Sequence, residues 1–159
     1  MKCIYPGSFD PITLGHLELV ERASRLFDQV VVAVLVNPAK KGFLPMEKRL
    51  ELIRQATLHL GNVTVDSFGG LLADYVAKVE GDVILRGVRS LGDCIGEIPA
   101  AQCNRRLNEK AETLMMVSSP EMSDLSSSAV REIFSFGGDV SSFVPECVLR
   151  ELKTMRGEK

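Results

Sequence analysis

The segment QVVVAVLV, residues 29–36, decides the fold class. After its first residue it contains only valine, alanine and leucine, so neither face of a strand here would be polar. A strand that is apolar on both faces is typical of a parallel sheet with helices packed on either side. The neighbouring segments therefore have to supply further strands and the helices that cover them.

Segments with strand composition alternate with segments of helical periodicity along the rest of the chain. Strands are predicted at 2–5, 62–68, 82–87 and 113–119, and helices at 14–27, 45–60, 71–80, 93–109, 127–136 and 145–155. This alternation indicates right-handed crossovers in one parallel sheet. We therefore predict an α/β fold, with a single domain over residues 1–159 built on a Rossmann-like, doubly wound sheet of about five parallel strands with flanking helices.

The composition narrows the classes of function. A net charge of −2 in 159 residues gives no support for a nucleic-acid or membrane partner. The four cysteines form no C-x-x-C pair and no metal-binding spacing, so we expect idle thiols in a reducing cytoplasm and no protein-bound metal. The start MKCIYPGS has too few apolar residues for a signal peptide.

Ligands of doubly wound sheets bind at the carboxyl ends of the strands, where the first candidate segment is YPGSFDPITLGH, residues 5–16. Ser8 offers a hydroxyl and an N–H group directly after the first strand. Thr13 is a plausible N-cap, and it places His16 in a first helical turn, where an anion is favoured. The alternative makes His16 a surface histidine, Thr13 only a cap, and Asp10 the start of an Asx turn.

Two further strand ends carry cations. Lys40 and Lys41 in NPAKKGF, residues 37–43, are either solvated loop charges or a cationic clamp. Arg86 and Arg89 in RGVRS follow the strand DVIL, and arginines at such an edge suit bidentate recognition of phosphate. Arg86 in particular closes an apolar run, where a charge is costly unless it has a partner.

The last strand end is followed by SSPEMSDLSSSAVRE, residues 118–132. Ser126, Ser127 and Ser128 open a helix there, and capping alone needs only one of them. The others add hydroxyl and N–H groups, and Arg131 lies one turn further on, so a second anion site is expected. The two helix N-termini and the cations together indicate a polyphosphate site, although the chain has neither the G-x-x-x-x-G-K-[ST] nor the G-x-G-x-x-G pattern.

These motifs carry a family resemblance. GSFDPITLGH resembles the (H/T)-x-G-H motif of the nucleotidylyltransferase superfamily, and LSSSAVR resembles its I-S-S-[ST]-x-x-[RK] signature. Together with KK and RGVR, they make residues 2–156 similar to the bacterial phosphopantetheine adenylyltransferases. The resemblance implies that ATP and 4′-phosphopantetheine react to give dephospho-coenzyme A and pyrophosphate. It further implies Mg²⁺ bound through the ATP phosphates, a cytoplasmic homohexamer and feedback binding of coenzyme A.

The resemblance also implies roles for individual residues. His16 would stabilise the transition state, and Lys40 would bridge the phosphates. Contacts with ATP are implied for Ser8, Phe9, His16, Gly87, Val88, Arg89, Glu97, Met122, Ser123, Asp124, Leu125, Ser126, Ser127 and Ser128. Contacts with phosphopantetheine are implied for Ser8, Lys40, Leu71, Leu72, Arg86 and Asn104.

The chain departs from the family pattern at two places. DCIGE, residues 93–97, stands where the family often has D-[FY]-x-[YF]-E, and Met122 stands where it often has an aromatic residue. Two alternatives stay open: a relative that uses nicotinate mononucleotide or a CTP-linked substrate, and a non-catalytic nucleotide-binding module. Relatives of the first kind usually read H-x-G-H, so Thr13 at the first position favours phosphopantetheine.

Overall fold

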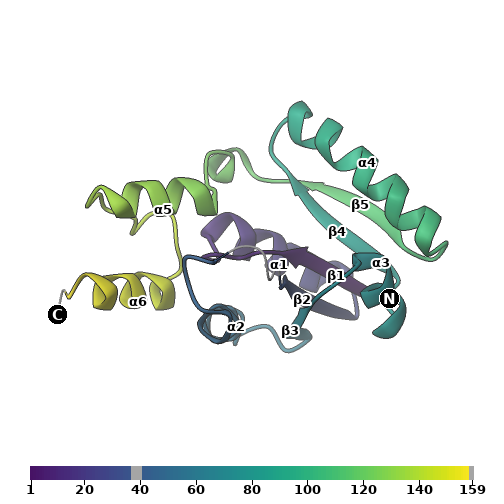
Figure 1. Ribbon diagram of the computed structural model, residues 1–159, viewed down its shortest axis with the longest axis horizontal. Helices are drawn as coiled ribbons and strands as arrows, with labels where there is room; N and C mark the ends of the chain where they lie inside the picture. Colours follow the sequence, from purple (N-terminus) through teal and green to yellow (C-terminus); the bar gives the residue numbers. More distant parts are fainter. Residues whose placement is uncertain (37–40, 158–159) are drawn as a thin grey trace.

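The computed structural model describes residues 1–36 and 41–157 and places all five strands in one sheet (Figure 1). The strands are β1 (Lys2–Gly7), β2 (Gln29–Leu35), β3 (Val63–Phe68), β4 (Val83–Val88) and β5 (Glu112–Val117). Their order is β3-β2-β1-β4-β5, and every neighbouring pair is parallel. The predicted Rossmann-like sheet is confirmed, and the direction of strand addition reverses between β1 and β4.

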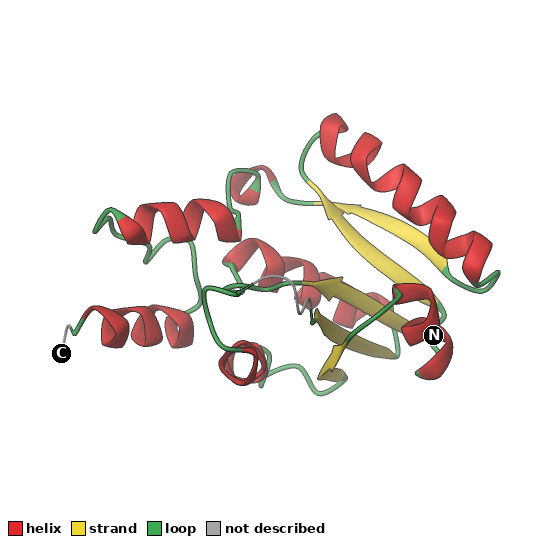
Figure 2. Cartoon of the chain, viewed as in Figure 1, coloured by secondary structure: helices red, strands yellow, loops and turns green. Residues whose placement is uncertain are grey.

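Within residues 1–36 and 41–157, six α-helices connect or follow the strands (Figure 2). They are α1 (Leu14–Leu26), α2 (Met46–Ala56), α3 (Leu72–Lys78), α4 (Leu91–Leu107), α5 (Ser127–Ser135) and α6 (Glu146–Arg156), with a 3₁₀ turn, η1, at Pro120–Met122. All six were predicted, but α2 ends four residues before the predicted position 60, and η1 was not predicted. In Figure 2, α4 runs along β4 and β5, while α5 and α6 lie at the other end of the molecule.

The sheet is packed on both faces, as the segment 29–36 required. Val30, Val32 and Val34 of β2 belong to one core cluster, to which α1, α2, α5 and α6 contribute. Val31 and Ala33 belong to a second cluster on the opposite face, with α3. Side chains alternate between the faces of a strand, so a continuous apolar run serves both clusters.

The strands β1 and β4 pair only near their beginnings. Their register covers Cys3 with Val83 and Ile4 with Ile84, whereas β1 and β2 pair over six residues, from Lys2 to Gly7. Pro6 has no N–H group to continue a ladder. The backbones of β1 and β4 are therefore not paired with each other at their carboxyl ends. The strand order reverses at this place, and such sheets bind ligands there.

Candidate active site

Three cavities lie around the carboxyl ends of the strands, and each is named here by one of its residues. The His16 cavity, of about 150 Å³, is lined by Tyr5, Gly15, His16, Leu19, Gly87, Arg89, Ser118, Met122, Leu125, Ser126 and Ser127. The Arg86 cavity, of about 260 Å³, is lined by Leu72, Ile84, Arg86, Glu97, Ala100, Ala101, Asn104 and Thr113. The Ser8 cavity, of about 530 Å³, is lined by Ser8, Asp10, Leu35, Val36, Lys41, Gly42, Phe43, Met46, Arg49 and Arg131.

His16 is held in one orientation by the first turn of α1. Thr13 is the N-cap, as predicted, and its Oγ1 accepts the N–H of His16 at 3.3 Å. The Thr13 backbone N–H in turn donates to His16 Nδ1 at 3.1 Å, which completes a capping box with histidine in the place of the usual glutamate. Because Nδ1 is an acceptor, the neutral ring carries its proton on Nε2.

The surroundings of His16 keep its ring neutral. Burial, and then the positive charges of Arg89 and Arg86, lower the pKa of His16 from 6.5 to about 4. The Phe9 ring also packs edge-on against the imidazole, with the ring centroids 5.1 Å apart. At neutral pH His16 is therefore a hydrogen-bond donor through Nε2–H and carries no positive charge.

This neutral state predicts a pH dependence of stability. The pKa of His16 is about 4 in the folded protein, below the ordinary value of 6.5, so the unfolded chain binds more protons between these two pH values. The free energy of unfolding should fall as the pH drops through this window, and it should be unaffected by His16 above it. Urea unfolding of wild type and His16→Gln checks this: the loss between about pH 7 and about pH 5 should be smaller in the variant. Equal losses would mean that His16 has the same pKa in the folded and unfolded states.

The three serines at the start of α5 already have partners inside the protein. Ser126 Oγ accepts the N–H of Ala129 at 3.0 Å and is the N-cap. Ser127 Oγ donates to the Pro11 carbonyl at 2.8 Å, and Ser128 Oγ accepts from Arg131 at 3.0 Å. What this turn offers a ligand is therefore mainly backbone N–H groups, which have no acceptor within the helix.

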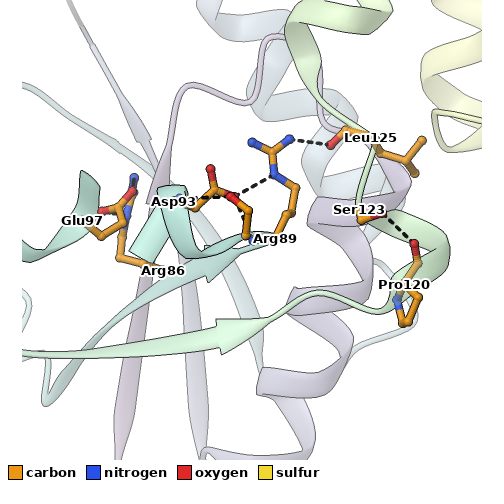
Figure 3. Close-up of polar contacts among 8 residues, drawn as sticks. Arg86, Arg89, Asp93, Glu97, Pro120, Ser123 and Leu125 are labelled. Atoms are coloured by element: carbon orange, nitrogen blue, oxygen red, sulfur yellow. Dashed lines mark hydrogen bonds and ion pairs between the residues drawn. The ribbon is translucent and has the colours of Figure 1, made fainter. Parts of the chain in front are cut away.

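The two arginines at the end of β4 enter different cavities (Figure 3). Arg86 donates to both carboxylate oxygens of Glu97, from Nε at 2.8 Å and from Nη2 at 2.7 Å, and to the Pro6 carbonyl at 2.9 Å. Arg89 donates from Nε to Asp93 Oδ2 and from Nη1 to the Leu125 carbonyl, both at 3.3 Å. The two cavities lie against different faces of the sheet: Ile84 of the second core cluster lines the Arg86 cavity, and Tyr5 and Leu19 of the first core cluster line the His16 cavity.

The Ser8 cavity contains Arg131, which the sequence analysis named, and Arg49, which it did not. Arg49 of α2 is only 10% exposed, lies 3.4 Å from the Asp10 carboxylate and donates to the Ser8 carbonyl at 3.3 Å. The Asp10 carboxylate also accepts the N–H groups of Phe43 and Leu44, at 2.7 and 2.8 Å. Asp10 therefore joins the loop after β1 to the loop before α2, which is more than a local Asx turn.

The structure thus brings most of the candidate residues to the edge of the sheet. The His16 cavity is lined by the candidates Gly87, Arg89, Met122, Leu125, Ser126 and Ser127. The Arg86 cavity is lined by the candidates Leu72, Arg86, Glu97 and Asn104. Ser8 lines the Ser8 cavity. Four further candidates are solvent-exposed and adjacent in sequence to residues that line a cavity: Leu71, Ser123, Asp124 and Ser128. The Phe9 and Val88 side chains are buried, which leaves their backbone for a ligand. Lys40 lies outside the described residues.

Glu97 and Arg49 differ most from the sequence-based view. Glu97, expected among the ATP contacts, lies beside Arg86 and Asn104, in a cavity that contains neither His16 nor Arg89. Arg49 could not be identified as a site residue from the sequence, because it lies within a helix whose apolar periodicity is accounted for by packing against the core. Only its long-range contacts with Asp10 and Ser8 identify it.

Comparison with known proteins gives a consistent result. A family model described as cytidylyltransferase-like matches residues 4–133. A phosphopantetheine adenylyltransferase from a Synechocystis species is 51% identical over 152 residues, with 96% of each chain covered. A phosphopantetheine adenylyltransferase from Clostridium perfringens is 47% identical over 159 residues, covering 98% of this chain and 97% of that one.

A solved structure supports the fold. It is described as a nicotinate-nucleotide adenylyltransferase from Vibrio parahaemolyticus, and it superposes with a TM-score of 0.74 over 98% of this chain and 93% of its own. Its sequence is only 18% identical, so the likeness concerns the fold and not the substrate.

Proposed function

Since this chain belongs to the cytidylyltransferase-like family, and within it to the phosphopantetheine adenylyltransferases, we propose how its residues carry out that reaction. The enzyme transfers the adenylyl group of ATP to 4′-phosphopantetheine, giving dephospho-coenzyme A and pyrophosphate, the penultimate step of coenzyme A synthesis. The observation that carries the mechanism is the position of His16 in a cavity between two helix N-termini and Arg89.

The reaction needs positioning more than acid–base chemistry. The phosphate of phosphopantetheine is already a nucleophile and attacks the α-phosphorus of ATP in line, so no group has to remove a proton. His16 Nε2–H donates to an α-phosphate oxygen as negative charge grows there. Backbone N–H groups at the start of α5 and the Arg89 guanidinium hold the outer phosphates. The family resemblance implies that Lys40 bridges the phosphates, and that role stays a prediction.

The adenosine and the pantetheine arm are proposed to bind on opposite faces of the sheet. Met122 and Leu125 give the His16 cavity an apolar wall on which the adenine can pack. Leu72, Ala100 and Asn104 give the Arg86 cavity an apolar surface and one amide, which suits an arm made of methylene groups and amides. The two phosphates then meet near the free carboxyl ends of β1 and β4.

Magnesium is proposed to arrive as part of the ATP substrate. Among residues 1–36 and 41–157, no group of three or more His, Cys, Asp or Glu side chains is placed to hold a metal ion. The groups that face the cavities are mainly cations and N–H donors, which fit the phosphates and not the metal. Bound Mg²⁺ would stabilise the charge of the leaving pyrophosphate.

The assembly is proposed to be a homohexamer with feedback binding of coenzyme A. Apolar side chains of α4 and of the edge strand β5 are solvent-exposed in the single chain, including Leu91, Ile95, Leu107 and Val117. Exposed apolar surface of this kind is typical of an interface between proteins. Light scattering of the purified protein tests the hexamer, and competition between coenzyme A and phosphopantetheine tests the feedback.

The compartment is proposed to be the cytoplasm. Cys3, Cys94, Cys103 and Cys147 are all free, as expected where thiols stay reduced. In the part of the chain that the structure describes, no helix is long and apolar enough to cross a membrane.

Pyrophosphate release tests the function directly. The enzyme should release pyrophosphate from ATP with 4′-phosphopantetheine and should release little with nicotinate mononucleotide. The buried Thr13 cap stands in the place of the first histidine that nicotinate-type relatives usually carry. Comparable release with nicotinate mononucleotide would contradict the proposed substrate, and release with neither acceptor would favour a non-catalytic nucleotide-binding module.

A further inference from the structure

Helix α4 carries two carboxylates that face the two arginines at the end of β4. Asp93 and Glu97 are four positions apart, so they lie on the same side of the helix, one turn from each other. Asp93 pairs with Arg89, and Glu97 pairs with Arg86. Figure 3 shows the two pairs as separate contacts, with Arg89 directed toward Leu125 and Arg86 directed away from it.

The Arg86–Glu97 pair uses one edge of the guanidinium. An arginine has five N–H donors, and here Nε and one N–H of Nη2 are taken by Glu97, while one N–H of Nη1 is taken by Pro6. One donor therefore remains on each of the two Nη atoms. Both partners are largely covered, with the Arg86 side chain 32% exposed and that of Glu97 22% exposed. The guanidinium is held at three points before any ligand arrives.

Arg89 is held in the same manner but more loosely. Asp93 Oδ2 accepts its backbone N–H at 2.8 Å and its Nε at 3.3 Å, and Leu125 accepts from Nη1. Its remaining donors, one on Nη1 and two on Nη2, belong to a side chain that lines the His16 cavity.

We propose that Glu97 and Asp93 are positioning residues that assign one arginine to each substrate: Glu97 fixes Arg86 for the phosphate of phosphopantetheine, and Asp93 fixes Arg89 for ATP. This inference rests on the proposed function. It places Glu97 on the phosphopantetheine side, whereas the family resemblance implied an ATP contact. The physical reason is preorganisation, since an arginine already held by its own carboxylate loses less side-chain freedom when the substrate binds.

Glu97→Gln tests the assignment, with Asp93→Asn as its matched control on the same helix. Glutamine has the size of glutamate but can accept with only one of its two terminal groups, so the fork to Arg86 is broken. Calorimetry with each substrate alone should show phosphopantetheine binding weakened by about tenfold in Glu97→Gln, with ATP binding changed by less than about twofold. Asp93→Asn should show the opposite division.

The other outcomes contradict the proposal in different ways. Weaker ATP binding in Glu97→Gln, with phosphopantetheine binding unchanged, would make Glu97 an ATP contact. Equal weakening of both substrates by both variants would mean that the carboxylates only hold α4 in place. Such a structural role has to be tested, because α4 has little burial to hold it: none of its 17 residues, all within the described part of the chain, is buried. Melting temperatures of both variants show how much each carboxylate stabilises the fold.

One measurement is independent of the substrates. The Arg86 Nε–H resonance should exchange slowly with water in wild type and in Asp93→Asn, and quickly in Glu97→Ala, because the alanine variant has no side-chain acceptor for it. A slow Arg86 Nε–H in Glu97→Ala would overturn the positioning role. If wild type shows the slow resonance but binds no phosphopantetheine, the pairing holds and the proposed function fails.

Discussion

His16→Ala is expected to lower kcat by at least about 10²-fold and to leave KM for both substrates nearly unchanged. The ring donates from Nε2 to charge that develops on the α-phosphate only during the reaction, so its loss affects the transition state more than the bound substrates. His16 is well suited to this because its pKa of about 4 keeps the ring neutral, and Thr13 fixes which nitrogen carries the proton. Pyrophosphate release at saturating substrates measures the effect.

Two controls separate catalysis from helix capping. His16→Gln preserves an acceptor for the Thr13 N–H, because glutamine is the ordinary residue at this position of a capping box. If capping were the only role of His16, the glutamine variant would retain kcat. His59→Ala removes the other histidine, which is exposed and pairs with Glu21, and it should behave as wild type. Near-full kcat in His16→Ala would exclude the catalytic role.

The fold and the edge that bears the site follow from local patterns. The run 29–36 required burial on both faces, and the structure distributes its side chains between two core clusters. The N-cap Thr13 was readable, as was a serine N-cap within residues 126–128, because capping depends on residues two or three positions apart.

Contacts between distant segments were not predictable. The Ser127 hydroxyl looked available because its partner, the Pro11 carbonyl, lies 116 positions away and could not be identified from the sequence. Arg49 and Glu97 were missed or placed differently for the same reason, since their partners lie 39 and 11 positions away.

Arg86→Ala is expected to weaken phosphopantetheine binding by about 10²-fold, with ATP binding changed by less than about threefold. Two charge-assisted hydrogen bonds, from the donors left on Nη1 and Nη2, are lost to the substrate phosphate, and each contributes about 1.5–3 kcal/mol before compensation. The variant also leaves the Glu97 carboxylate without its partner and close to an incoming phosphate, which adds repulsion. Calorimetry with each substrate measures both affinities.

The repulsive part can be removed by a second substitution. Arg86→Ala combined with Glu97→Ala should bind phosphopantetheine better than Arg86→Ala alone and still worse than wild type, because the attraction is absent but the unpaired carboxylate is gone. Arg86→Lys keeps the charge without the fork, so it should recover only part of the affinity. The pKa of His16 gives an internal check: the Arg86 charge lowers it, so the histidine should titrate at a higher pH in Arg86→Ala. Equal losses of affinity for ATP and phosphopantetheine would contradict the division of the two arginines between the two substrates.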